Sequence, residues 1–517
     1  MSNLYKIPNT WKWATLEEIT DTTSGGTPKR TNKDYWNGSI NWLKSGELND
    51  GYINAVEETI TEEGLKKSSA KVFEAGTLLM AMYGATVGRL GILKVDTSTN
   101  QAVCAIFNSF NLFSNEYVFF YLKYTRQQML EDSFGGAQPN LSQGYINNIE
   151  IPFAPLNEQK RIVKKIEKLF SNLDNSDKYL VHLEKQLKRY RQSVLKSAFE
   201  GELTREWRDK QTDLDSAEEL LEKIKYERIE YIDQEVREKF KDKTEKWIAD
   251  KVKEEVDKFY NGLKAIENIE KPFAIPKKWE WIQWEQILKY GDGSFKRGPF
   301  GSALKKAFFV KDNTYKVYEQ YCPINDDCSF ERYYISKDKF TELKSFEVKE
   351  KDYLISCSGS IGKITQIPKE YKNGVINQAL LRVRINDSFY LDKFFITLFR
   401  SSFFQANIIN NSTGSAMINV KGVKELKALP LPMLSIAEQK EIIKEIERHF
   451  SIIDKLETVV QKSIKESKRL RQSILKQAFE GKLVEQDPSD ESAEKLLEKI
   501  AKVKEEYKKE MSKRKKK

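Results

Sequence analysis

One block of sequence occurs twice in this chain, and it constrains the possible folds more than any other feature. The first copy opens at Glu158–Lys160 and closes at Arg191–Gly201. The second copy repeats the same words at Glu438–Lys440 and Arg471–Gly481, at a constant offset of 280 residues. Chance does not preserve so long a match without a gap. The sequence is therefore interpreted as two copies of one unit, a pseudo-two-fold internal repeat.

Each copy of the block predicts a long helix. Apolar residues recur from Ile162 to Val194 in steps that alternate between four and three, and Ser176 fills the one missing position. A heptad seam of more than four repeats is typical of a coiled coil. A helix over residues 156–199 would be about 65 Å long. Antiparallel pairing of the two helices is the simpler path for the chain, although parallel pairing also satisfies the seam.

The second copy keeps the seam with polar interruptions. His449 stands where the first copy has Leu169, and it is interpreted as a packed, half-exposed seam residue. Ser435 and Glu438 predict a capping box at the start of this helix, as Ser216 and Glu219 do for a later one. The apolar seam positions are Ile442, Ile446, Ile453, Leu456, Val460, Leu470 and Ile474, with Ser463 and Ser467 between them.

A globular segment precedes each long helix. Both segments are rich in short strand-like runs and glycine turns, which indicates an α+β fold. Residues 75–93 read as two strands around such a turn, and a helix is expected near 115–130. The predicted boundaries are a first globular domain (1–155), a central helical region with a possible hairpin near 242–245 (156–271), a second globular domain (272–433) and a C-terminal helical region with a basic tail (434–517).

Composition excludes several classes of protein. The 517 residues hold two histidines and four cysteines with no CxxC pair, which leaves little material for a zinc site or a catalytic histidine. There is no signal peptide and no apolar run of about 18 residues, so a cytoplasmic location is expected. The net charge of +10 gathers in the second half of the chain and in the lysine-rich tail, so it is weak support for nucleic-acid binding.

No catalytic motif is evident. An amino-methyltransferase would need a Pro-Pro-aromatic turn to hold its target base, and the chain contains no Pro-Pro pair. The run Gly359–Ile364 resembles a phosphate loop only faintly, because Cys357 stands where its first glycine should be and Ile364 where a Ser or Thr should bind magnesium. The sequence therefore predicts a chain that binds and positions without catalysing, with no cofactor or metal of its own.

Polar loops in the two globular segments are the candidates for binding. Arg89 and Lys363 occupy matching places after a glycine turn, where they could contact phosphates or base edges. Gln138, Asn140 and the pair Asn377-Gln378 could offer amides to adenine. Turn formation or internal bracing explains these amides at least as well.

These motifs resemble the specificity (S) subunit of type I DNA restriction-modification systems over nearly the whole chain. The resemblance is carried by Gly26–Pro28, Tyr35–Trp42, Gly84–Gly88, Gln138–Ser142 and the Glu-Gln-Lys that opens each helix. The second globular segment departs from it, with Lys296–Ser302 and Ser415–Asn419 in place of two of these motifs.

The resemblance implies two α+β target recognition domains, each reading one half of a split DNA sequence, separated by helices that pair as an antiparallel coiled coil. It also implies that the helices set the gap and dock two methylation subunits, with restriction (helicase-nuclease) subunits outside them. S-adenosylmethionine, ATP and magnesium would belong to those partners. The candidate DNA-binding residues are Lys29, Arg30, Lys44, Ser45, Tyr83, Thr86, Arg89, Gln138, Asn140, Ser142, Lys296, Arg297, Lys305, Ser358, Ser360, Lys363, Ser415, Asn419 and Lys421.

The repeated block supplies the candidate partner-binding residues. Its near-identity exceeds what a helical seam requires, which suggests that two identical partners dock on it. Two other functions stay open, a self-contained DNA-modifying enzyme and a coiled-coil adaptor that binds only proteins. The candidate partner-binding residues are Glu158, Gln159, Lys160, Arg191, Gln192, Phe199, Glu438, Gln439, Lys440, Arg471, Gln472 and Phe479.

Overall fold

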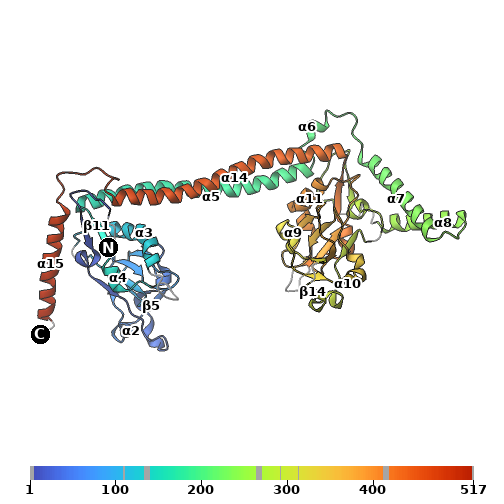
Figure 1. Ribbon diagram of the computed structural model, residues 1–517. Helices are drawn as coiled ribbons and strands as arrows, with labels where there is room; N and C mark the ends of the chain where they lie inside the picture. The colour runs from blue at the N-terminus through green and yellow to red at the C-terminus, as the bar shows by residue number, and fades with distance from the viewer. Residues whose placement is uncertain are drawn as a thin grey trace. The chain divides into compact units, whose positions relative to one another are not determined.

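The computed structural model describes residues 5–108, 111–132, 140–263, 271–291, 293–311, 314–410 and 419–514. The chain forms two compact units (Figure 1). Unit 1 combines residues 1–182 with 460–517, and unit 2 comprises residues 183–459. Each unit therefore holds one globular domain, called head one and head two, together with parts of both long helices.

The two long helices are α5 (Leu156–Phe199) and α14 (Ile436–Phe479), each of 44 residues. In unit 1, Arg471 of α14 forms ion pairs with Asp174 at 2.9 Å and Asp177 at 2.8 Å on α5. In unit 2, Arg191 pairs with Asp454 and with Glu457 in the same way. The pairing partners run in opposite directions along the two helices, which confirms the predicted antiparallel coiled coil.

The predicted details of the helices are mostly confirmed. His449 is half-buried, and its ring nitrogen lies 3.1 Å from the Tyr190 hydroxyl. The Ser216–Glu219 capping box is present. At Ser435 only half of the predicted box forms: its hydroxyl accepts from the Glu438 N–H, while the Glu438 carboxylate bonds to residues outside the helix. The predicted hairpin lies between α7 (Ala217–Lys239) and α8 (Glu245–Gly262).

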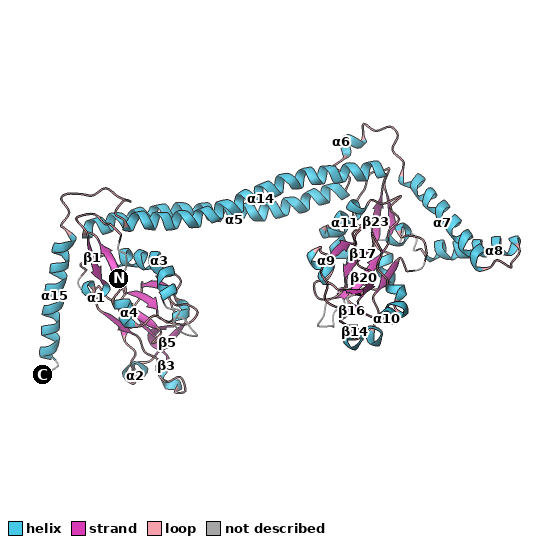
Figure 2. Cartoon of the chain, viewed as in Figure 1, coloured by secondary structure: helices cyan, strands magenta, loops and turns pink. Residues whose placement is uncertain are grey.

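Head one is built on two sheets. The first has the strand order β2-β10-β7-β8-β4, and the second β5-β3-β9-β6. All four residues of β7 are buried, as expected of a central strand covered on both faces. Helix α3 covers one face of the first sheet, which confirms the helix predicted near 115–130 (Figure 2). The elements are β2 (Thr22–Ser24), β3 (Trp36–Leu43), β4 (Gly51–Ile53), β5 (Glu58–Ile60), β6 (Val72–Phe73), β7 (Leu78–Ala81), β8 (Leu90–Leu93), β9 (Thr97–Thr99), β10 (Val103–Ile106) and α3 (Asn115–Asp132).

Head two repeats this plan with different side chains. Its sheets have the orders β13-β20-β17-β18 and β14-β16-β15-β19, and α11 and α12 pack into the same core as β17 and β20. The elements are β13 (Phe295–Arg297), β14 (Phe309–Val310), β15 (Tyr315–Tyr318), α9 (Tyr321–Asn325), β16 (Tyr334–Ile335), α10 (Lys337–Glu342), β17 (Tyr353–Ser356), β18 (Ile364–Gln366), β19 (Gly374–Ile376), β20 (Leu380–Val383), α11 (Asp392–Arg400), α12 (Ser402–Ile408), β21 (Ile409–Asn410) and β22 (Asn419–Val420).

A two-stranded sheet leads from each head into its helix. In unit 1, β1 (Lys12–Thr15) pairs with β11 (Glu150–Phe153), which directly precedes α5. In unit 2, β12 (Glu280–Gln283) pairs with β23 (Pro430–Met433), which precedes α14. The remaining short helices are α1 (Leu16–Ile19), α2 (Glu62–Lys66), α4 (Gln143–Asn147), α6 (Arg205–Arg208) and α13 (Val423–Lys427).

Each head takes part of its core from the other copy of the repeat. Phe479, at the end of α14, packs its ring against Tyr117, Tyr121 and Tyr124 of α3 in head one. Phe199, at the end of α5, packs against Phe394 of head two. The helices that follow continue this exchange, with α15 (Ala493–Arg514) in the core of unit 1 and α7 in that of unit 2. The predicted domain boundaries follow the sequence repeat, whereas these units join segments of both copies.

Three further observations bear on the excluded classes. All four cysteines are free. Across the part of the chain that the structure describes, no helix combines the length and the apolar character that crossing a membrane would require. Within the same residues, no group of three or more His, Cys, Asp or Glu side chains could hold a metal ion.

Candidate nucleic-acid interface

The polar loops of head two gather at one edge of its first sheet. Because the strands are antiparallel, β13 and β17 end at the edge where β20 and β18 begin. The segments that leave the sheet there are 298–305, 357–363 and 377–379. The strand pair β21 and β22 lies close by, since a side chain on Gly362 would meet Gln405 and Ile408 just before β21. We call these four segments the recognition edge of head two.

Head one has an equivalent recognition edge. Strands β2 and β7 end where β10 and β8 begin, which gathers residues 25–30, 82–89 and 100–102. A fourth segment joins them because Tyr83 forms a β-bridge with Asn140 and the Leu141 N–H donates to the Met82 carbonyl at 2.7 Å. The sheet topology thus brings together predicted site residues that are far apart in the sequence.

The glycine turns of the two edges have the same backbone conformation. Gly84 and Gly88 have φ of +84° and +75° in head one, and Gly359 and Gly362 have +65° and +71° in head two. Only glycine adopts this left-handed region at little cost. The Gly88 N–H donates to the Ala81 carbonyl at 2.8 Å, and Gly362 donates in the same way to Ser356 at 2.9 Å.

The residue after each turn is an exposed cation. Arg89 in head one and Lys363 in head two both point into solvent from equivalent positions, as a side chain that contacts a phosphate or a base would. Around them, Tyr83, Thr86 and Ser358 are half-buried, while Ser360, Asn140 and Ser142 are exposed. The Ser142 hydroxyl is already used, because it accepts from the Tyr145 N–H and caps α4.

Two of the other predicted cations of head one, Arg30 and Lys44, are held by neighbouring carboxylates. The Arg30 guanidinium lies over the Trp36 ring at 3.8 Å and forms an ion pair with Glu58. Lys44 bonds to Glu57 at 3.0 Å and to Glu58 at 2.9 Å. The hydrogen bond from Arg30 lowers the pKa of the Glu58 carboxyl, so this partner stays charged. Lys29 is exposed and Ser45 half-buried nearby.

Head two has a more basic edge. Lys296 and Arg297 are half-buried on β13, and Lys305 is exposed just beyond it. The Lys296 ammonium lies 4.6 Å from the centre of the Phe346 ring. Lys421 donates its backbone N–H to the Ile408 carbonyl at 2.9 Å, which places it beside the Gly362 turn, and Asn419 belongs to β22. Of the other predicted residues, Gln138 and Ser415 lie outside the described residues.

Some of the predicted amide side chains form hydrogen bonds that stabilise the turns of the recognition edges. The Asn377 side chain accepts from the Ala379 N–H at 3.0 Å, so it braces the turn before β20. Gln101 in head one accepts from the Thr27 hydroxyl. The structure adds Gln320, which sequence reasoning missed: its side chain lies beside Gly359, and its buried oxygen finds no partner among the described residues. No local sequence pattern could have identified Gln320. It reaches the edge only because the end of β15 is bonded there, through the Asn377 N–H and the Tyr318 carbonyl.

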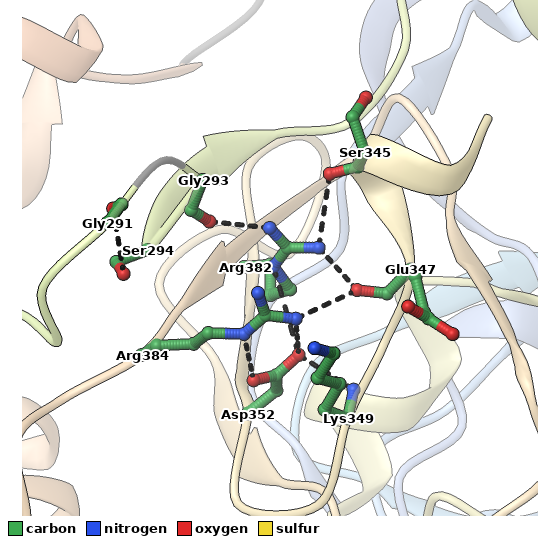
Figure 3. Close-up of polar contacts among 9 residues, drawn as sticks. All are labelled: Gly291, Gly293, Ser294, Ser345, Glu347, Lys349, Asp352, Arg382 and Arg384. Atoms are coloured by element: carbon green, nitrogen blue, oxygen red, sulfur yellow. Dashed lines mark hydrogen bonds and ion pairs between the residues drawn. The ribbon is translucent and has the colours of Figure 1, made fainter. Parts of the chain in front are cut away.

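Behind the edge of head two lies a buried charged cluster (Figure 3), which has no counterpart among the described residues of head one. The Arg382 guanidinium donates to the backbone carbonyls of Gly293, Ser345 and Glu347, and it is 1% exposed. Arg384 bonds to both oxygens of Asp352, at 2.7 and 2.9 Å. Burial lowers the pKa of Arg382 to about 10, so it remains a cation at neutral pH.

The Glu-Gln word that opens each long helix is buried inside its own unit. Glu158 accepts from the Trp11 indole at 2.9 Å and from Gln486. Glu438 accepts from the Trp279 indole at 2.8 Å and from Arg208 at 2.6 Å. Gln159 and Gln439 bond to backbone groups of head one and head two: Ser114 and Ala154 for the first, and Phe389, Leu391 and Leu434 for the second.

This arrangement revises the roles predicted for the repeated block. Phe199, Phe479 and the two Glu-Gln pairs are buried in contacts within the chain, so their side chains do not offer a surface to a partner. Arg191 and Arg471 are half-buried and paired across the coiled coil. Only Lys160, Gln192, Lys440 and Gln472 are exposed, and for them partner binding stays a prediction. The two copies make corresponding internal contacts, which is a reason for their near-identity.

Sequence comparisons agree with the repeat. The family model described as "Type I restriction modification DNA specificity domain" matches twice, at residues 8–185 and 276–466. The chain is 24% identical to the type I restriction enzyme EcoBI specificity subunit of Escherichia coli, over 97% of this chain and 94% of that one. It is 30% identical to the MjaIX specificity subunit of Methanocaldococcus jannaschii, over 36% of this chain and 43% of that one.

Structural comparisons show the same fold. A chain from a structure of complex assembly and conformational transition in the type I R-M system aligns with a TM-score of 0.62 and 17% identity, covering 93% of this chain and all of that one. The HsdS subunit from Thermoanaerobacter tengcongensis aligns with a TM-score of 0.51 and 15% identity, covering 93% of this chain and 99% of that one.

Proposed function

Because the chain belongs to the type I restriction modification DNA specificity family, we propose that it is the subunit that selects the DNA target for a methylating and cleaving complex. Each head reads one half of a bipartite sequence, and the paired helices set the gap between the halves. The observation that carries this proposal is the pair of recognition edges, which share one backbone plan and differ in side chains.

The chemistry of the edges supports contact with DNA. Exposed cations after glycine turns let backbone N–H groups and side chains approach phosphates together. The edge of head one is the less basic, because Arg30 and Lys44 are paired with carboxylates. Head one therefore depends more on base contacts, and head two more on phosphate contacts, whose strength falls with added salt.

The catalytic steps belong to partner chains. Two methylation subunits dock on the coiled coil near the exposed residues Lys160, Gln192, Lys440 and Gln472, and restriction subunits join outside them. S-adenosylmethionine, ATP and magnesium are bound by those partners. The role of this chain is to bind DNA, to hold the reading edges in place and to position its partners.

A head exchange tests the proposal. Residues 1–150 are replaced by the head of another specificity subunit, with Trp11 and the aromatic residues that receive Phe479 retained so that the core of unit 1 still closes. The methylated sites in host DNA are then sequenced. We expect one half of the target to change and the other half to stay. An unchanged target, or a change in both halves, would show that the heads do not read separately.

A further inference from the structure

One aromatic side chain at the recognition edge of head two is left mostly exposed to solvent. Phe300 is 69% exposed, and no large hydrophobic side chain in the described residues is more so. It follows β13 directly and stands at the start of a short 3₁₀ turn over Gly301–Leu304. Burying such a ring is favourable, so a site that leaves it in water is suited to a partner that covers it.

The backbone holds this ring in a defined place. The Gly298 N–H donates to the Leu380 carbonyl at 2.9 Å, and a side chain at Gly298 would lie 1.8 Å from the Asn377 carbonyl oxygen. Pro299 is buried and restricts its own φ. The ring therefore projects from an ordered segment packed against the turn at Asn377, and not from a loose loop.

The surroundings of Phe300 are basic. Arg297 lies 5.8 Å from the ring centre, and Lys305 and Lys306 are exposed beyond it. Lys363 follows the neighbouring glycine turn of the same edge. The cations would attract a partner that carries many negative charges, and the apolar ring would need an apolar surface on that partner. In a nucleic acid the wide apolar surfaces are the faces of the base pairs. Double-stranded DNA is such a partner.

Head one carries no ring at the matching position. Gly25 donates to the Val103 carbonyl as Gly298 does to Leu380, which aligns Thr27 with Phe300. The Thr27 hydroxyl donates to the Gln101 side chain, so the residue at this position links two segments of the recognition edge of head one. The ring is a property of head two alone.

We propose that Phe300 is a wedge that enters between two adjacent base pairs in the half-site read by head two. This inference rests on the proposed function and adds a residue that determines specificity. A wedge discriminates by the ease with which a step unstacks, and pyrimidine–purine steps such as TA and CA/TG open most readily. Head two therefore prefers such a step at the position of the ring, without a hydrogen bond to either base.

Fluorescence of 2-aminopurine tests the wedge. The full-length chain, in complex with its methylation subunits, first selects its target from random duplexes, and 2-aminopurine then replaces single bases along the head-two half. We expect the fluorescence to rise at one step on binding, because the base there is unstacked. In Phe300→Ala the rise disappears and affinity falls by about tenfold, as for removal of a buried aromatic contact. In Phe300→Leu, which keeps an apolar wedge, part of both effects remains.

Tyr226→Ala is the matched control. Tyr226 is 64% exposed on α7, which packs at the opposite edge of the sheet through Tyr290 and Asn386. This variant should keep both the fluorescence and the affinity. An unchanged fluorescence rise in Phe300→Ala, or no rise in the wild type, overturns the wedge while the proposed function stands. A wild-type complex that enriches no sequence overturns the proposed function and the wedge with it.

Discussion

Head one and head two share a backbone plan and differ in what stabilises it. At equivalent places behind the recognition edge, head one has Ala105 on β10 and head two has the buried Arg382 on β20. Head one closes this region with an apolar cluster, and head two with three carbonyls and a carboxylate around two guanidiniums. The fold thus accommodates either an apolar or a charged interior at the same place.

Asp352→Ala is expected to give the largest effect, and only in head two. The change leaves the buried Arg382 and the half-buried Arg384 without their carboxylate, which should destabilise the head by about 3–5 kcal/mol. Thr77→Ala, the matching change in head one, should cost less than about 1 kcal/mol. Amide hydrogen exchange in β17 and β20 measures the first, and in β7 and β10 the second. Equal losses in the two heads would contradict this difference.

Truncation of the exchanged phenylalanines should affect the heads equally. Phe479→Ala removes a ring from the core of head one, and Phe199→Ala removes one from head two. Each should cost about 3–4 kcal/mol, the usual range for a buried Phe. Exchange of amides in α3 and in α11 reports on the two heads separately. Loss of protection in the head of the same repeat, with the other head unaffected, would mean that the cores are not exchanged.

Neutralising the glutamate that opens each long helix should cost different amounts of stability in the two units. Glu438→Gln leaves Arg208 without its charge partner and should destabilise unit 2 by about 2–3 kcal/mol. Glu158→Gln keeps a neutral partner for Trp11 and should cost about 1 kcal/mol or less. Urea unfolding followed by the fluorescence of each indole, with the other tryptophans substituted, measures both. Equal costs would show that the ion pair between Arg208 and Glu438 adds no stability beyond the hydrogen bond from the tryptophan.

The pH dependence of stability should also reveal the contribution of Glu158. Burial raises the pKa of Glu158 above the usual 4.5 of a glutamate, so the folded state binds a proton more readily than the unfolded state. Stability contributed by this group therefore rises as the pH falls from above the folded pKa towards 4.5. The wild type should show this rise in unit 1, and Glu158→Gln should not. A variant that retains the full pH dependence would assign it to another group.

The smallest expected effect concerns Arg89 and Lys363, the exposed cations at equivalent positions after the glycine turns. Arg89→Ala and Lys363→Ala should each weaken DNA binding by about 1 kcal/mol and reduce the salt slope by about one unit, as for one lost phosphate contact. Titrations at several salt concentrations measure both quantities. If Arg89 instead reads a base, Arg89→Ala will relax the sequence preference at one position and leave the slope nearly unchanged.

Much of the candidate site could be anticipated from local sequence. The glycines at 84, 88, 359 and 362 indicated turns, and the residue after each turn is exposed as expected. Lys44 and Arg30 show the limit, since nothing near them in the sequence predicts their pairing with Glu58 across a sheet. Gln320 was missed for the same reason, because strand pairing alone brings it to the edge.

By itself, the sequence determined the duplication, the two long helices, the heptad seam and the family, because periodicity and repeated words are local properties. Only the tertiary structure decided where the repeated ends of the helices go. The Phe that closes each copy enters the core of the other copy's head, whereas the glutamate that opens each copy accepts a hydrogen bond from the tryptophan of its own head. These contacts join residues far apart in the chain, and antiparallel packing selects them because it buries both rings and pairs both carboxylates.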